Sequence, residues 1–263
     1  MLPLKEDDTY AVLSDRGMAD GSERGFYRHD TRYLSSYIWK LPNFSLLVSQ
    51  TPRPDHLVQH WSLIEGPSQV VGLRRELTLR RGGFSDVLEL ENTSLEPHSV
   101  EVNLDLKAAF SDLFEARGWH TVQRTVTGLH YTAEDGLEVA THLDIIPESP
   151  SLSWIFALQP REKVRVEVKA SFQSPFDPHG AELPSYEAWA ARFPMNLESG
   201  RARRVLEQAV SDLRALLFSL PEGLFPAAGI PWYVCPFGRD SLLTAYMTLP
   251  WAADVAKGVL TYL

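Results

Sequence analysis

The sequence predicts a mainly β protein with an α-helical segment at its C-terminal end. Up to about residue 175, short segments of alternating apolar and polar residues recur, which is typical of half-buried antiparallel strands. No helical pattern separates these segments, so the expected architecture is an antiparallel β-sandwich rather than a βαβ fold. Beyond residue 184 the apolar period changes to 3.6, which predicts helices.

The predicted strands fill a first domain that we place at residues 1–174. The alternating segments are residues 36–41, 75–80, 85–92, 99–106, 137–140 and 163–168. Turn-forming residues punctuate them at 81–83, 92–94, 134–136 and 159–161.

A proline-rich stretch at residues 174–184 begins the second part of the chain. We expect a linker with one short helix at 175–198; that helix covers 186–193, with Ser185 as its N-cap. Residues 199–263 then form helices, predicted at 201–220, 240–249 and 255–263. Pro221 and Pro250 end the first two, because proline cannot continue a helix.

Composition and charge exclude several classes of partner. The 263 residues include 25 lysines and arginines against 34 aspartates and glutamates, a net charge of −9 without any basic block, which argues against nucleic acid and anionic membranes. The sequence shows neither an apolar signal region nor a membrane-spanning stretch, so we expect a cytoplasmic protein. The single cysteine, Cys235, cannot form an internal disulfide.

No metal ion and no cofactor are expected either. His56 and His60 have a ligand-like spacing, but the surrounding pattern is that of a strand. Residues four apart in a strand lie about 13 Å from each other, too far to share an ion.

The most informative segment is residues 229–243, an aromatic and proline-rich loop that runs into a helix beginning with Arg239 and Asp240. Arginine is a fixed fork of donors, and a carboxylate near a helix N-terminus is a fixed acceptor. With Trp232, Tyr233 and Phe237 nearby, these groups suit a sugar, whose C–H face packs on aromatic rings and whose hydroxyls bond to charged groups. The alternative is that Asp240 caps the helix and the aromatic residues belong to the core.

Three segments carry a resemblance to a known family. Residues 231–242 (PWYVCPFGRDSL) resemble the start of the catalytic domain of bacterial and archaeal glycogen debranching enzymes of the amylo-α-1,6-glucosidase type, which are (α/α)6-barrel glycoside hydrolases. Residues 25–35 (GFYRHDTRYLS) and 110–118 (FSDLFEARG) resemble the N-terminal domain of that group. The resemblance implies that residues 199–263 are the first helices of an incomplete (α/α)6 barrel.

The resemblance also implies a substrate and a set of contacts. The partner would be an α-glucan oligosaccharide or glycogen. Arg239 and Asp240 would bind hydroxyls of the terminal glucose at subsite −1, with Trp232 as a platform and Phe237 beside them. Two further groups, Asp30 with Arg32 and Asp112 with Glu115 and Arg117, either line the rim of that site or form ion pairs between the sandwich and the helices; ion pairing is the simpler interpretation.

The catalytic residues are expected to be absent. Glycoside hydrolysis needs two carboxylates, which an inverting enzyme holds about 6.5–9.5 Å apart. A twelve-helix barrel needs at least about 200 residues, whereas 80 residues follow from Pro184 onward. We therefore expect this chain to supply the sandwich and part of the glucose site without the acid and base.

Two alternatives stay open. The chain could be a fragment of another exo-acting (α/α)6-barrel glycosidase. It could also be a non-catalytic module that binds α-glucan or another subunit. An incomplete helical layer would expose apolar residues such as Leu213, Leu216 and Leu217, and would favour self-association or a partner that covers them.

Overall fold

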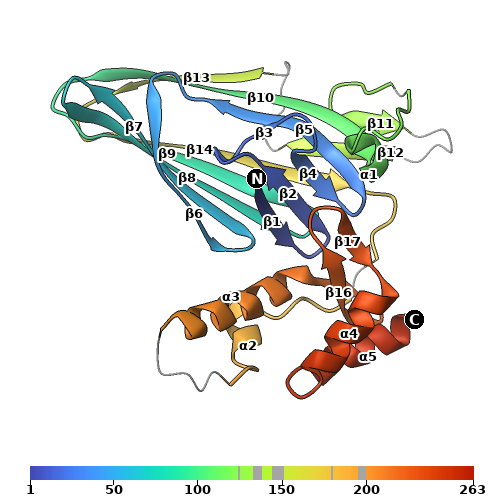
Figure 1. Ribbon diagram of the computed structural model, residues 1–263. Coiled ribbons are helices and arrows are strands. Elements are labelled where there is room, and N and C mark those ends of the chain that lie inside the picture. Colours follow the sequence, from blue (N-terminus) through green and yellow to red (C-terminus); the bar gives the residue numbers. More distant parts are fainter. Residues whose placement is uncertain (124, 133–137, 144–150, 179, 195–199) are drawn as a thin grey trace.

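The computed structural model describes residues 1–123, 125–132, 138–143, 151–178, 180–194 and 200–263. Within these residues, two large antiparallel sheets lie above a smaller part made of helices and a short three-stranded sheet (Figure 1). The predicted β-sandwich followed by helices is therefore confirmed.

The first sheet of the sandwich has the order β1-β2-β4-β5-β10-β13, with β3 paired to β5. Its strands are β1 (Leu2–Glu6), β2 (Thr9–Leu13), β3 (Ala19–Asp20), β4 (Gly25–Arg28), β5 (Thr31–Lys40), β10 (His98–Asp112) and β13 (Ser151–Leu158).

The second sheet has the order β11-β12-β14-β9-β8-β7-β6. Its strands are β11 (His130–Thr132), β12 (Glu138–Leu143), β14 (Lys163–Gln173), β9 (Gly83–Asn92), β8 (Ser68–Arg80), β7 (His56–Glu65) and β6 (Phe44–Arg53). Burial along β9 alternates almost residue by residue, as the period-two pattern predicts. The predicted turn at 134–136 and residue 137 lie outside the described residues.

Aromatic rings fill the space between the two sheets. Phe26 of the first sheet stacks on Phe84 of the second, with ring centroids 4.3 Å apart. Tyr33 stacks on Phe172 in the same way, at 4.8 Å. All four side chains are fully or almost fully buried, so they hold the sheets together through a large apolar contact area.

The C-terminal part begins with two helices and continues as a three-stranded antiparallel sheet and two more helices. Its elements are α2 (Tyr186–Ala190), α3 (Arg201–Leu216), β15 (Leu217–Leu220), β16 (Gly223–Gly229), β17 (Tyr233–Pro236), α4 (Gly238–Thr248) and α5 (Ala253–Tyr262). The last two helices confirm the segments predicted at 240–249 and 255–263, with ends displaced by one or two residues.

The helix predicted at 201–220 is too long. It ends at Leu216, and the next four residues form β15, in which Leu217 pairs with Pro226 and Phe218 with Phe225. All four are buried, because this strand packs in a second apolar cluster with Tyr10 and Tyr27 of the sandwich. Leu217 is therefore not part of an exposed face, and Leu213 and Leu216 are half-buried against the same cluster.

Exposed apolar side chains lie at other positions of the C-terminal part. Tyr246 and Met247 of α4 and Leu260 of α5 are each more than two thirds exposed. No helix in the described part of the chain is long and apolar enough to cross a membrane.

Ser185 caps α2 as predicted, because its hydroxyl accepts a hydrogen bond from the Ala188 amide at 3.1 Å. Replacing Ser185 by alanine is expected to lower the free energy of unfolding by about 1 kcal/mol, the usual cost of losing such a cap. Urea denaturation would measure this loss. The matched change Ser45→Ala, at an exposed position on β6, is expected to stay within about 0.5 kcal/mol of the wild type.

Candidate functional site

Arg239 and Asp240 lie in the first turn of α4, where the sequence places them. Their side chains form an ion pair of 3.2 Å between Nη2 and Oδ2, and the Arg239 guanidinium lies 5.3 Å from the centre of the Phe237 ring. Phe237 is the N-cap residue and no side chain caps this helix, so Asp240 does not serve as the cap. The neighbouring Ser241 is buried and donates to the Pro226 carbonyl at 3.0 Å, which fixes the start of α4 against β16. Substrate contact by Arg239, Asp240 and Phe237 stays a prediction.

Trp232 does not join this group. It lies in the turn between β16 and β17, and the four-residue strand β17 separates it from Phe237. At about 3.3 Å per residue, the two Cα atoms are roughly 16 Å apart. The Trp232 ring instead faces the sandwich, where the Arg117 guanidinium lies 4.9 Å from its centre. Residues 229–237 were expected to form a loop, but they include the strand β17. This strand separates Trp232 from Arg239 along the chain.

Asp112, Glu115 and Arg117 belong to a short helix, α1 (Leu113–Ala116), that sequence reasoning missed. The Glu115 amide donates to Asp112 Oδ1 at 2.8 Å and the Asp112 amide donates to Glu115 Oε2 at 3.0 Å, which is a capping box. Its signal, a D-x-x-E sequence, is present at residues 112–115. The Arg117 guanidinium lies over both Trp119 and Trp232, at 4.2 and 4.9 Å, and so joins α1 to the β16–β17 turn.

Asp30 and Arg32 do not pair with each other or with those groups as the simpler interpretation expected. Arg32 Nε donates to the Ser111 hydroxyl at 3.0 Å, within the first sheet. Asp30 makes no hydrogen bond or ion pair with any residue that the structure describes. It occupies the β4–β5 turn after His29, whose positive φ of 50° turns the chain there.

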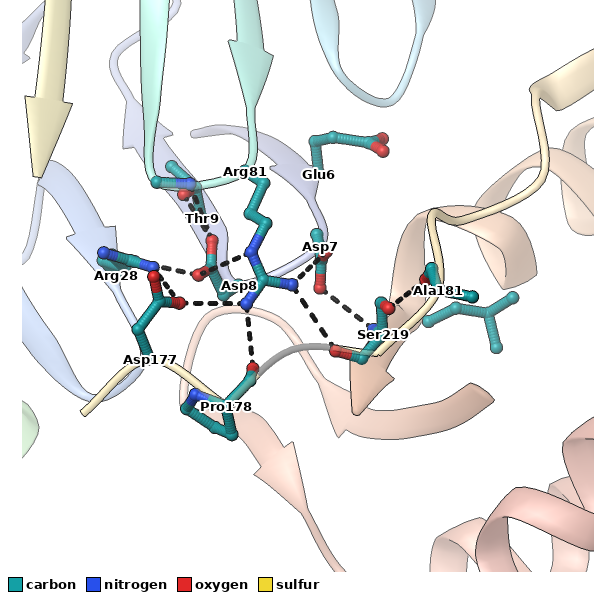
Figure 2. A network of polar contacts seen from close by, with 12 residues as sticks. Glu6, Asp7, Asp8, Thr9, Arg28, Arg81, Asp177, Pro178, Ala181 and Ser219 are labelled. Atoms are coloured by element: carbon teal, nitrogen blue, oxygen red, sulfur yellow. Dashed lines mark hydrogen bonds and ion pairs between the residues drawn. The ribbon is translucent and has the colours of Figure 1, made fainter. Parts of the chain in front are cut away.

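A network of charged residues joins the sandwich to the C-terminal part (Figure 2). Arg81, in the β8–β9 turn, lies at its centre and donates to Asp7 Oδ2 at 3.0 Å, to Asp177 Oδ1 at 2.9 Å and to the Pro178 carbonyl at 2.8 Å. Asp7 Oδ1 in turn accepts from the Ser219 amide of β15 at 3.0 Å. The acidic residues after β1 therefore position β15, and the sequence contains no local pattern that shows it.

The second half of the network is more deeply buried. Arg28 donates from Nε to Asp8 Oδ2 at 2.8 Å and from Nη2 to Asp177 Oδ1 at 2.5 Å. Asp8 Oδ1 accepts from the Gly82 amide at 2.8 Å and from the Thr9 hydroxyl at 2.9 Å. Since almost every acceptor here has a donor, the network holds the linker against the sandwich without leaving buried charge unpaired.

Among the residues that the structure describes, two groups have ligand atoms close enough to share a metal ion. They are Asp8 with His29 and Asp177, and Asp112 with Glu115 and His120. In the first group, Arg28 already bonds to both carboxylates, which places positive charge where an ion would sit. In the second, the two carboxylates form the capping box of α1. Neither arrangement favours a cation.

A pocket of about 650 Å³ lies where the sandwich, the linker and the C-terminal part meet. Its wall includes His29 and Asp30 from the β4–β5 turn, Phe176 from the linker, Cys235 from β17 and Tyr262 from α5. Burial in this concave site raises the pKa of Asp30, although the residue remains open to solvent within the pocket, and the Asp112 charge adds to the rise. Burial raises the pKa of the Cys235 thiol, and the nearby Asp30 carboxylate raises it further.

A known protein family matches the part of the chain that forms the sandwich. The family described as the N-terminal domain of (some) glycogen debranching enzymes matches residues 4–169. A comparison with curated proteins gave no match. Among solved structures, the "Putative kojibiose phosphorylase from human microbiome" has a TM-score of 0.41 and 8% identity, over 65% of this chain and 30% of that chain. This chain thus corresponds to less than a third of that protein. The matched residues are more than half of the sequence, and the chain belongs to the family of glycogen debranching enzyme N-terminal domains.

Proposed function

We propose that this chain supplies the sandwich domain and part of the terminal-glucose site of a glycogen debranching enzyme that acts on α-1,6 branches. The observation that carries the proposal is the Arg239–Asp240 pair in the first turn of α4, beside the exposed ring of Phe237. The helix N-terminus stabilises the Asp240 carboxylate as an acceptor, and Arg239 presents several donors in one plane. A glucose unit offers matching hydroxyls and a C–H face for the ring.

Binding without hydrolysis is part of this proposal. The carboxylates of the C-terminal part near this site are already paired: Asp240 with Arg239, and Asp254 with Arg192 Nη1 at 2.8 and 2.9 Å. A general acid must instead hold a proton near neutral pH. We therefore expect the purified chain to release no glucose from panose or limit dextrin; release of glucose would contradict this part of the proposal.

The glucose site can be tested by native electrophoresis in gels that contain glycogen, which slows proteins that bind it. Replacing Arg239 by alanine is expected to weaken binding about tenfold or more, because hydrogen bonds from a charged group contribute about 1.5–3 kcal/mol. The matched control is Arg24→Ala, at another exposed arginine that is ion-paired with an aspartate, Asp20. Equal retardation of all three proteins would contradict a role for Arg239.

A second candidate is an interaction module, which the exposed Tyr246, Met247 and Leu260 favour. Sedimentation of the purified chain distinguishes the two. A concentration-dependent increase in mass that Met247→Lys abolishes would favour the interaction module.

A further inference from the structure

The first sheet of the sandwich ends at β13, which pairs with β10 on one side (Figure 1). The two strands keep a continuous register along all eight residues of β13. On the other side of β13, the backbone groups of residues 152–157 form no hydrogen bond with any residue that the structure describes. A row of unpaired N–H and C=O groups is a template for a further strand.

The other edge strands of the sandwich are protected against such pairing. β1 contains Pro3, and the Lys5 amide of the same strand donates to the Pro54 carbonyl at 2.9 Å. β6 contains Pro52 and has two irregularities in its register with β7, and β11 is three residues long. Proline, bulges and short length are the usual means by which proteins keep edge strands from pairing. β13 has neither a proline nor a bulge.

The side chains of β13 are also suited to a neighbouring strand. Its sequence, SLSWIFAL, contains no charged residue and is rich in aromatic and branched side chains. Ile155, on the outer face, is 72% exposed. On the inner face, Leu152, Trp154 and Phe156 are only half-buried. A strand added beside β13 would therefore cover apolar side chains on both faces of the sheet.

Charge indicates that a second copy of the chain can approach at this edge. Each copy has a net charge of −9, so two copies repel each other over most of their surfaces. Beside β13, Glu101 of β10 lies opposite Ile155. If two β13 strands pair across a two-fold axis, the two Glu101 residues are three strand spacings apart, about 14 Å. Their repulsion is largely screened, because the Debye length at physiological salt is about 8 Å.

We propose that β13 pairs antiparallel with β13 of a second copy of this chain, so that the two first sheets become one continuous sheet. A two-fold axis through Ile155 places Trp154 opposite Phe156 of the second copy, an aromatic cross-strand pair. The same axis places Ser153 opposite Ala157 of the second copy, so only uncharged side chains oppose each other.

This contact closes with two copies, because each copy uses the same edge. The opposite edge of the sheet, β1, is protected, and the sheet therefore does not extend further. A contact between one pair of short strands belongs to the small interfaces, below about 1,200 Å² of buried surface. We accordingly expect a weak dimer whose population increases with protein concentration.

Sedimentation equilibrium of the purified chain over a range of concentrations measures this dimer. Ile155→Lys is expected to raise the dissociation constant about tenfold or more, because it replaces an apolar contact at the axis by two like charges. In the monomer the new lysine lies opposite Glu101, a favourable cross-strand pair, so we expect the fold to persist. Ser153→Lys, at an exposed polar position, is a second variant with the same expected effect. Far-UV circular dichroism confirms that each variant is folded.

The matched control is Val48→Lys, which makes the same change of charge at a 40% exposed aliphatic residue of the edge strand β6. It is expected to leave the dimer intact, as is Met247→Lys in α4. Added salt should strengthen the wild-type dimer, because screening reduces the repulsion between two chains of charge −9. A dimer that weakens with salt would indicate contact between opposite charges and would contradict pairing through β13.

The inference is overturned if the wild type stays monomeric at every concentration, or if the dimer survives both Ile155→Lys and Ser153→Lys. A dimer that Met247→Lys abolishes and Ile155→Lys preserves would place the contact on α4 and would also overturn it. The glycogen-gel comparison of the wild type with Arg239→Ala is independent of these results and remains the test of the proposed function.

Discussion

Replacing Arg75 by methionine is expected to lower the free energy of unfolding by about 3–5 kcal/mol, the cost of leaving a buried charge without its partner. Arg75 and Asp86 lie between the two sheets, and both side chains are 0% exposed. Arg75 Nη2 donates to Asp86 Oδ2 at 2.9 Å, and the same carboxylate accepts from Trp39 Nε1 at 2.8 Å. Without the guanidinium, the Asp86 carboxylate would remain in the core with the Trp39 indole as its main remaining donor.

The neighbouring residue provides the matched control for this prediction. Arg74 has a 44% exposed side chain on the opposite face of β8 and pairs with Glu76 at the surface. Arg74→Met is expected to stay within about 0.5–1 kcal/mol of the wild type, as exposed ion pairs do. Urea denaturation, monitored by far-UV circular dichroism, measures both changes in stability. Each change follows from the shift of the denaturation midpoint when the dependence of the free energy on urea concentration has the same slope in both proteins.

A double variant separates the lost ion pair from the lost packing. Arg75→Met with Asp86→Leu replaces the pair by apolar groups and is expected to recover most of the stability, because the isolated charge is gone. A loss below about 1 kcal/mol for Arg75→Met alone would show that Asp86 is hydrated or protonated rather than enclosed.

The sandwich could be predicted from the sequence because its signal is local. In β8 and β9 the side chains alternate between the core and the opposite face, so a window of a few residues already indicates a strand. The segments predicted at 75–80 and 85–92 accordingly lie within these two strands. The positions of Ser185 and of Arg239 and Asp240 could be predicted for the same reason, since each depends on residues close in the chain.

The features that sequence reasoning missed depend on contacts between distant residues. Leu217–Leu220 continues the apolar pattern of α3, and only its pairing with β16 and its burial against β2 and β4 make it a strand. Similarly, Asp30 and Cys235 are separated by more than 200 residues and meet only in the folded pocket. The two motifs that contain them were found separately, but no periodicity places one against the other.

Lys5 leads to the second prediction: raising the pH from 8 to 10.5 should stabilise the wild type relative to Lys5→Met by about 3 kcal/mol. The Lys5 ammonium is fully buried and donates to the backbone oxygens of Asp7 at 2.5 Å, Ala215 at 2.9 Å and Leu217 at 3.3 Å. Burial lowers its pKa from 10.5 to about 8, against the opposing effect of the carboxylates of Asp7, Glu6 and Asp8. Each unit of this shift corresponds to about 1.4 kcal/mol.

The direction of this change in stability with pH follows from the number of protons that the folded and the unfolded states bind. Below pH 8 both the folded and the unfolded chain carry the Lys5 proton, so this residue gives no pH dependence. Between pH 8 and 10.5 the unfolded chain keeps the proton that the folded chain has lost, and stability therefore rises with pH. Above pH 10.5 neither state is protonated and the contribution is constant.

Urea denaturation of both proteins across this pH range measures the difference directly. The comparison is necessary because the buried tyrosines, such as Tyr27 and Tyr33 with pKa values raised to about 12, act in the opposite direction in both proteins. Lys107→Met, at an exposed position on β10, is the matched control and should show no such rise against the wild type. If the difference between wild type and Lys5→Met were independent of pH, the ammonium would be hydrated. The Lys5 ammonium would then not be enclosed between β1 and the end of α3, and its hydrogen bonds to the Ala215 and Leu217 carbonyls would not contribute to holding β15 against the sandwich.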